Sequence, residues 1–243
     1  MRRTKCFFAI LALVSAFLLT ANSWGEVYRA TFDTWTDAYV NAKGETIEVV
    51  SFEFRSLADT KGLRGPDSIR SVKVKAPEGT IFDLTGSWSE WRNHYFARFS
   101  ASAFTSLTLP GGRYQGTVVD KSGNKLIANK TLPKTLTFLP IPVITDPLPG
   151  ATVSSLIPTI SWDAVDGAQL YCLELVNASA GEPVYYYPHN RIHVYRNSFT
   201  IPLNVLFPNT NYSVRIEARN SDKSMTMRSR SPWINFTTPA AAP

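Results

Sequence analysis

Two tryptophans, a histidine and a tyrosine lie close together in the stretch SWSEWRNHY at 87–95. Polar residues separate the rings, a composition more typical of a loop than of a strand. Exposed rings of Trp88, Trp91 and Tyr95 would form a flat platform for sugar rings or for the apolar surface of a partner. The alternative is that Trp88 or Trp91 covers one end of a β-sandwich, because an indole buries a large apolar area. The sequence leaves both interpretations open.

A second aromatic group contains Tyr185, Tyr186 and Tyr187, followed by His189 and His193. Residues four apart on a strand are separated by about 13 Å, whereas a Zn–N bond is about 2 Å long. The two histidines therefore do not predict a metal site. A hydrogen-bonding, partly exposed edge strand is the simpler interpretation. A protein-contact patch that includes Tyr185 and Tyr187 is the alternative, since tyrosine is enriched at interfaces.

Motifs for catalysis are missing from the sequence. The chain has three histidines, and it contains no Gly-x-Ser-x-Gly elbow, no phosphate-binding glycine loop and no cysteine-pair metal motif. The paired carboxylates of a glycosidase can lie far apart in a chain, so a small hydrolase stays open as the weaker alternative. We expect a protein that is not an enzyme and that has no catalytic residues, cofactor or metal.

The N-terminus has the order of a secretory signal peptide. Basic residues precede an uncharged apolar run at 7–19, and small residues follow at 21–23. The run is shorter than the about 20 residues that span a bilayer. We therefore expect cleavage of the signal peptide, 1–23, and a secreted or periplasmic product without a membrane span.

Cleavage would change the charge and the cysteine content. The chain has 25 Lys and Arg against 19 Asp and Glu, and the signal peptide contains three of the basic residues and no acid, which leaves 22 against 19. Such a mild excess does not predict nucleic-acid binding. Cys172 would be the single remaining cysteine, so no intramolecular disulfide is expected. Alternation along its strand predicts that Cys172 faces outward beside Glu174.

Strand patterns dominate the rest of the chain. Apolar and polar residues alternate in several short segments: 46–49, 52–54, 72–75, 107–109 and 171–175. Turn residues separate these segments, and no long stretch has apolar spacing of 3.6. This pattern is typical of antiparallel β-sandwiches. The sequence predicts an all-β fold with two β-sandwich domains in series.

A proline-rich seam is the best candidate for the domain boundary, because proline makes a short and stiff spacer. We expect an immunoglobulin-like sandwich at 26–138 and a linker at 139–150 that runs into the first strand of the next domain. The second domain is expected at 141–238, followed by a tail at 239–243.

The second half contains four motifs in a fixed order: TISWDAV at 159–165, YCLEL at 171–175, LFPNTNY at 206–212 and SPWINFTT at 231–238. Together they resemble a fibronectin type III domain over 141–238. Alternation places Trp162, Tyr171 and Phe236 on inward faces. The resemblance implies that Tyr212 is the corner tyrosine, whose hydroxyl bonds to backbone just upstream, and that Leu206 fills the same corner.

The first half repeats one feature of the second. Pro110 and Tyr114 have the same spacing as Pro208 and Tyr212, and each tyrosine opens an alternating strand. This similarity supports an N-terminal immunoglobulin-like sandwich with Tyr114 in its core. The stretch 88–92 is similar to the Trp-Ser-x-Trp-Ser box of cytokine receptors, but its fifth residue is arginine and it lies in the wrong domain, so we do not assign that box.

These observations favour a monomeric, non-catalytic protein that binds another protein at the cell surface or in the periplasm. The alternative is an accessory protein that binds a surface glycan through Trp88, Trp91 and Tyr95. The identity of the ligand does not follow from the sequence.

Overall fold

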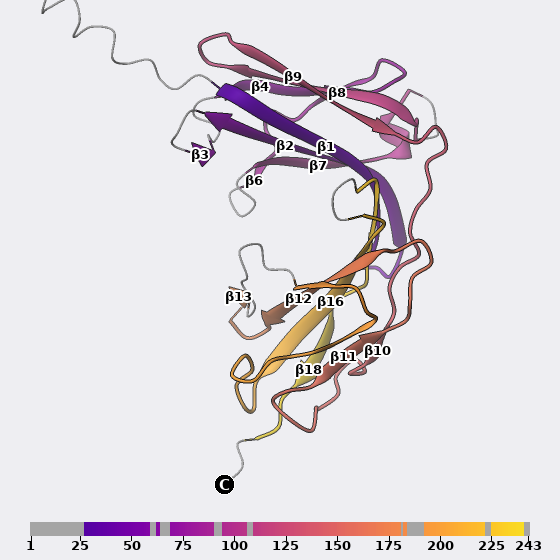
Figure 1. Cartoon of the computed structure of the whole chain (residues 1–243), viewed down its shortest axis with the longest axis vertical. Coiled ribbons are helices and arrows are strands. Elements are labelled where there is room, and N and C mark those ends of the chain that lie inside the picture. Colours follow the sequence, from indigo (N-terminus) through magenta and orange to yellow (C-terminus); the bar gives the residue numbers. More distant parts are fainter. Residues whose placement is uncertain are drawn as a thin grey trace, which may run out of the picture.

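The computed structural model describes residues 27–58, 62–63, 69–89, 94–105, 109–180, 182–183, 192–221 and 225–240. Within these ranges the regular structure consists of β-strands and one short 3-10 segment. The chain is therefore all-β, as the alternating patterns predict. Figure 1 shows two groups of strands along the long axis, with a bend between them. The expected signal peptide lies outside the described residues.

The first half contains the following elements: β1 Val27–Val40, β2 Thr46–Ala58, β3 Gly62–Leu63, β4 Ile69–Lys75, β5 Ile81–Asp83, β6 Trp88–Ser89, β7 His94–Ser100, η2 Ala101–Ala103, β8 Gly112–Asp120 and β9 Lys125–Leu132. The second half contains the following strands: β10 Ile144–Asp146, β11 Thr159–Trp162, β12 Leu170–Asn177, β13 Glu182–Pro183, β14 Ile192–Val194, β15 Ser198–Thr200, β16 Asn211–Arg219, β17 Met227–Arg230 and β18 Ile234–Thr237.

The core of the first half lies between two sheets. The sheet β5-β4-β8-β9 covers one side, and β1, β2 and β7 cover the other. Aromatic rings fill much of the space: the ring of Phe52 lies 5.2 Å from that of Phe82 and 5.6 Å from that of Tyr114, measured between centroids. A Cβ atom at Gly116 would lie 2.8 Å from the ring of Phe32. Glycine at this position therefore lets the phenyl ring approach the backbone of β8.

The core of the second half has the same construction. The sheet β10-β11-β15 faces the strands β12, β16 and β18. The ring of Trp162 meets Tyr171 edge to face at 5.3 Å, and Tyr212 stacks with Phe236 at 5.8 Å. Alternate residues of β16 from Tyr212 to Ala218 point into this core, as period-two spacing requires.

Tyrosine hydroxyls tie both halves to nearby backbone. Tyr212 accepts a hydrogen bond from the N–H of Phe207 at 2.8 Å, and Tyr114 donates to the carbonyl of Pro110 at 2.6 Å. Each bond joins the start of a long strand to the turn that precedes it. The corner that the resemblance implied for Tyr212 is therefore present, and Tyr114 makes a similar contact in the first half.

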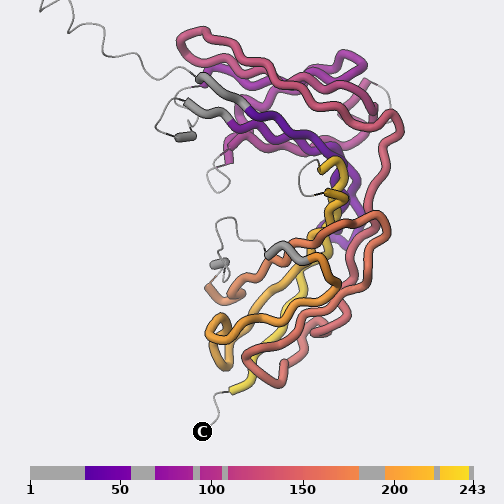
Figure 2. Tube along the Cα trace, viewed as in Figure 1, coloured from indigo at the N-terminus to yellow at the C-terminus, as the bar shows by residue number. Residues whose placement is uncertain are grey.

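Strand β1 joins the two halves. Its residues Thr36–Tyr39 pair in parallel with Met227–Arg230 of β17, while its other edge pairs with β2 in antiparallel fashion. The path β13-β12-β16-β17-β1-β2-β7-β6 is therefore one sheet that continues through the bend (Figures 1 and 2). The hydroxyl of Thr36 also donates to the carbonyl of Thr137 at 2.7 Å. The halves are linked by backbone pairing and not by the connecting chain alone.

The hydrophobic cores nevertheless stay separate. One cluster draws its residues from Phe32 to Leu136 and the other from Leu139 to Phe236. The change from one cluster to the other falls beside the proline-rich seam. The domain limits 26–138 and 141–238 remain a prediction from the sequence.

Cys172 points away from the hydrophobic core, as alternation predicts, but it does not reach solvent, because its thiol is fully buried. The opposite face of β12 is covered, however: Glu217 lies directly across from Cys172 on β16, and Arg219 is close enough to interact with the thiol electrostatically. Long charged side chains cover the small one.

Candidate functional site: a charged layer on the continuous sheet

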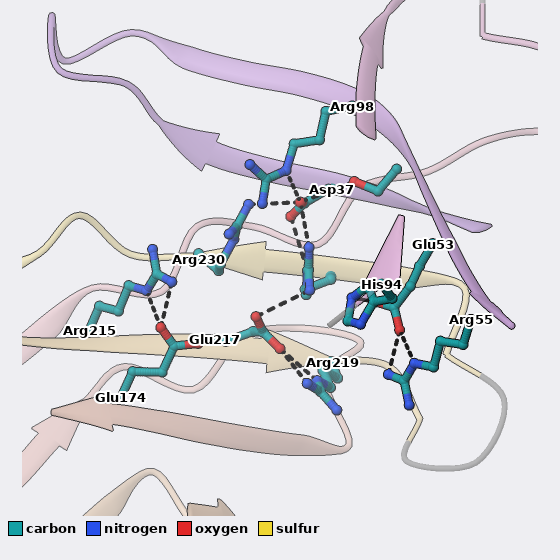
Figure 3. A network of polar contacts seen from close by, with 12 residues as sticks. Asp37, Glu53, Arg55, His94, Arg98, Glu174, Arg215, Glu217, Arg219 and Arg230 are labelled. Atoms are coloured by element: carbon teal, nitrogen blue, oxygen red, sulfur yellow. Dashed lines mark hydrogen bonds and ion pairs between the residues drawn. The ribbon is translucent and has the colours of Figure 1, made fainter. Parts of the chain in front are cut away.

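One face of the continuous sheet points away from both hydrophobic cores, and charged side chains gather there. Because side chains alternate along a strand, residues opposite the core positions of each strand share this face. Paired strands bring these residues next to one another across the joint (Figure 3). We call the following set the charged layer: Asp37, Glu53, His94, Arg98, Glu174, Arg215, Glu217, Arg219, Arg228 and Arg230.

Asp37 is the centre of the layer. Its side chain is 0% exposed, and its Oδ2 accepts hydrogen bonds from Arg98 Nε at 3.0 Å, Arg228 Nη2 at 2.7 Å and Arg230 Nη2 at 2.7 Å. The hydroxyl of Ser51 adds a further bond at 3.2 Å. Strands β1, β7 and β17 thus meet at one carboxylate. Burial alone would raise the pKa of Asp37, but the attraction of Arg228 and Arg230 holds it below its usual value.

Glu217 is the second buried carboxylate near the joint. Arg219 donates to its Oε1 from both Nε at 2.7 Å and Nη2 at 2.6 Å, so that one carboxylate oxygen receives two charge-assisted hydrogen bonds. The Nη1 of Arg228 lies 3.4 Å from Glu217 Oε2. Burial opposes the charge of Arg228, yet the two carboxylates, Glu217 and Asp37, raise its pKa above the usual value. Arg228 thus bridges the acids of the two halves.

Aromatic rings lie beneath the arginines. The Cζ atom of Arg228 lies 4.7 Å from the ring centroid of Trp35, and those of Arg98 and Arg230 lie 5.1 and 5.2 Å from that of Tyr39. Such contacts stabilise a cation most where water is excluded. The rings of Trp35 and Tyr39 on β1 therefore pack against the guanidinium groups.

A smaller network lies further along β2 and β7. Arg55 Nε donates to Glu53 Oε1 at 2.6 Å, and His94 Nε2 lies 3.4 Å from Glu53 Oε2. Burial would raise the pKa of Glu53, but His94 and Arg55 lower it to about 2. The carboxylate of Glu53 is therefore charged throughout the physiological pH range.

The other end of the layer is closer to solvent. Arg215 Nε donates to Glu174 Oε2 at 2.6 Å, and the guanidinium carbon of Arg215 lies 4.4 Å from the ring centroid of Trp233. Trp233 is among the large apolar residues that remain exposed. An accessible indole, that of Trp233, therefore lies beside Arg215 at this end of the charged layer.

The structure places the aromatic platform differently from the prediction. Tyr95 is 1% exposed and belongs to the core of the first half, so its assignment to an exposed platform is wrong. The polar residues around it suggested a loop, but Trp88 and Tyr95 face each other on the paired strands β6 and β7. Trp88 is half-buried, and its ring meets Tyr95 edge to face at 5.2 Å.

Other predicted contact residues cannot be placed in the fold. Trp91, Tyr185 and Tyr187 lie outside the described residues. All six residues predicted for the structural core are buried: Tyr114, Trp162, Tyr171, Leu206, Tyr212 and Phe236.

The charged layer itself was missed by the sequence analysis. Its signal lay in charged residues at every second position of 215–219 and 228–230, and in Asp33 and Asp37, which share one face of 33–39. Alternation of this kind ordinarily marks a face in water, because an isolated sandwich has one solvated side on each sheet. The parallel pairing of β1 with β17, which converts these faces into one layer, leaves no pattern in the sequence.

Two features are absent from the described ranges. Within them, no three His, Cys, Asp or Glu side chains come together as metal ligands would. The same ranges contain no helix with the length and apolar character of a membrane span.

Comparison with known proteins gives similarity in structure alone. No family model matches the chain, and no curated protein sequence matches it. Solved structures that match include the FN1–FN3 domains of chicken CNTN1, with 18% identity over 85% of this chain and 66% of that one, at a TM-score of 0.34. Two fibronectin type III domains of chicken tenascin match with 15% identity over 84% of this chain and 97% of that one, at a TM-score of 0.29.

A third matching structure is the BSP domain of a biofilm-associated protein, with 15% identity over 88% of this chain and 30% of that one, at a TM-score of 0.26. The first two neighbours are fibronectin type III structures, the class that the second half resembles in sequence. At these scores, the description of the fold rests on the strand pairing and the cores of this chain.

Proposed function

We propose that this chain is an exported, non-catalytic interaction protein that binds another protein at the cell surface or in the periplasm. The observation that supports the proposal best is the continuous sheet, in which β1 pairs with β17 and Asp37 binds arginines from both halves. This joint would hold the binding surfaces of the two halves at a fixed distance and angle.

The physical advantage of such a joint is preorganisation. Association costs less when the groups that contact the partner are already ordered. A flexible spacer between two sandwiches would leave each half free to turn, whereas the buried Asp37 network resists any movement that separates its charges. A rigid frame of this kind suits a scaffold or a docking module better than a chain that closes around a small substrate.

The second half also presents exposed aromatic side chains from which contacts could be made. Tyr195, Phe207 and Trp233 are all exposed. Tyrosine, tryptophan and phenylalanine are enriched at protein interfaces relative to the rest of a protein surface. We propose that the partner binds mainly to this half.

Site-specific photo-crosslinking tests the proposal in cells that export the protein. A photoreactive residue at Tyr195 or Phe207 should give one discrete covalent adduct with a second protein. The matched control is Ile81, which is equally accessible but lies on β5 of the first half. Equal labelling at all three positions, or adducts at none of them, would contradict a specific protein interaction by the second half.

A further inference from the structure

The charges around Asp37 do not balance. Two buried carboxylates, Asp37 and Glu217, contact four guanidinium groups, those of Arg98, Arg219, Arg228 and Arg230. Among the described residues of this cluster, the difference is an excess of two positive charges. Glu53 also attracts Arg228, but Arg55 pairs with the Glu53 carboxylate, so including this pair leaves the excess unchanged.

The excess is located on two of these arginines. Arg219 binds Glu217, and Arg228 contacts both Glu217 and Asp37. Among the described residues, Arg98 contacts one carboxylate, that of Asp37, while Arg230 binds Asp37 and is also attracted by Glu217, which lies across from it on β16. Both arginines bind the same Asp37 oxygen, Oδ2, at 3.0 and 2.7 Å. Two cations are therefore held near one another by one carboxylate oxygen that a third arginine, Arg228, also shares.

Arg98 and Arg230 also have N–H groups that could donate hydrogen bonds to a ligand. The side chain of Arg230 is 5% exposed, and its Nε–H is buried without a hydrogen-bond partner. A buried donor of this kind is normally satisfied, and an exception indicates a missing partner. The side chain of Arg98 is 26% exposed, so this part of the cluster can be reached from solvent.

The ring of Tyr39 fixes the arrangement. The guanidinium carbons of Arg98 and Arg230 lie 5.1 and 5.2 Å from its centroid, which places both groups on one aromatic support. Guanidinium groups present planar pairs of N–H donors that match the oxygens of a carboxylate or phosphate group. The cluster thus combines positive charge, unused donors and a rigid base.

We propose that Arg98, Arg230 and Tyr39 form a binding site for a small oxyanion, that is, for a carboxylate, sulfate or phosphate group. The anion approaches from the exposed side of Arg98, accepts hydrogen bonds from both guanidinium groups and neutralises their excess charge. Tyr39 supports the two cations from below. This site is independent of whether the chain binds a partner protein.

The ionisation of the two arginines agrees with this assignment. Burial and the neighbouring charge of Arg228 lower the pKa of Arg230 to about 9. Burial likewise lowers the pKa of Arg98, although Asp37 opposes the change. Both cations thus lie where a further negative charge would stabilise them.

The direct test is an NMR titration of the arginine Nε–H signals in the mature chain. Sodium phosphate, sodium sulfate and sodium acetate are added separately at constant ionic strength, with sodium chloride as the reference salt. The signals of Arg98 and Arg230 should shift and saturate, while that of Arg113, an exposed arginine on β8, stays in place. The proposal is overturned if no oxyanion gives a saturable shift, or if all three signals drift together.

Two variants complete the test. Arg98→Gln removes the charge and the guanidinium group and leaves a shorter, neutral amide, so the oxyanion should bind about tenfold more weakly or worse, because hydrogen bonds to charged groups are the strong ones. Arg113→Gln removes the same charge from an exposed position, and its affinity should equal that of the wild type. Equal weakening in both variants would mean that general charge attraction, and no site, holds the anion.

The choice of salt identifies the source of the anion. Saturation by acetate alone would show that the site takes a carboxylate, such as an acidic side chain of a partner. Saturation by phosphate or sulfate would show that it takes a tetrahedral anion. If Arg98→Gln does not fold, the wild-type titration still decides, since it uses the unaltered protein.

Discussion

Replacing Asp37 by asparagine removes the negative charge that three arginines share at the joint. The side chain is fully buried, and asparagine has nearly the same shape, so the change leaves the packing intact. It removes the carboxylate that Arg98 and Arg230 both bind, so that Glu217 is the described acid left to attract Arg230. Removing one member of a buried ion pair costs about 3–5 kcal/mol, because the remaining charge stays desolvated. We expect Asp37→Asn to lower the free energy of unfolding by about this amount.

Asp33→Asn is a matched control. Asp33 lies on the same face of β1, and its carboxylate accepts a bond from Lys130 Nζ at 3.0 Å. That carboxylate is 55% exposed, however, and an ion pair in water contributes about 0–1 kcal/mol. The two variants remove the same charge from the same strand and differ mainly in burial.

Urea unfolding of the protein at neutral pH measures both effects. Far-UV circular dichroism and tryptophan fluorescence are followed together, since coincident transitions are required before two-state analysis. Separate transitions in Asp37→Asn would indicate that the halves have become uncoupled, which the position of Asp37 at the joint also allows. If Asp37→Asn and Asp33→Asn unfold at the same urea concentration, the buried network does not hold the halves together and the reasoning is refuted.

The same pair of proteins makes a prediction for acid. The arginines hold the pKa of Asp37 below its usual value of 3.8, so its stabilising effect is complete above that pH and is lost as the pH falls through the lower folded value. The gap in stability between wild type and Asp37→Asn should stay constant from neutral pH to about 5 and shrink in stronger acid. Glu53, with a pKa of about 2, is present in both proteins and cancels in the difference. A gap that stays unchanged in strong acid would contradict this assignment.

Three further predictions concern the core and the N-terminus. Trp162→Ala should lower the free energy of unfolding by about 3–5 kcal/mol in urea, because the indole is buried against Tyr171; a loss below about 1 kcal/mol would contradict its place in the core. Tyr212→Phe keeps the ring but leaves the N–H of Phe207 without its acceptor, so a loss of about 1–2 kcal/mol is expected, and an unchanged melt would show that the corner bond is not needed. Intact-mass measurement of the exported protein should find a new N-terminus between Asn22 and Glu26, and recovery of Met1 in a membrane fraction would overturn the signal-peptide assignment.

Period-two alternation predicted several strands and their inward faces, among them those at 46–49, 72–75 and 171–175, but it did not identify β1. A side chain on a strand points to one of two faces of the sheet. The rings of Trp162 and Phe236 come from the two facing sheets, and their burial in the shared core stabilises the fold. The spacing from Pro208 to Tyr212 is equally local, because the hydroxyl must reach backbone only a few residues away. Local geometry of this kind can be inferred from the sequence.

Tyr95 shows where a local argument failed. Its polar neighbours suggested an exposed loop, yet Tyr95, Ala97 and Phe99 share the inward face of β7 and pack into the first core. The alternation from Tyr95 to Phe99 does predict a strand, but the polar composition of 87–94 led to Tyr95 being assigned to an exposed platform. Here the packing follows the alternation, because burying the ring of Tyr95 removes more apolar area from water than leaving the ring in an exposed loop would.

The sequence by itself determined an all-β chain and six residues of its cores, because alternation within a strand decides which side chains face inward. The tyrosine corner followed from the resemblance to a fibronectin type III domain. The tertiary structure alone decided that β1 would pair with β17, since Asp37 and Arg228 are 191 positions apart and no periodicity connects them. That one pairing turned two faces with the pattern of solvated surfaces into a buried charged layer. The charges of Asp37, Arg98, Arg228 and Arg230 were all readable in the sequence; their burial and mutual distance, which set their energies, were not.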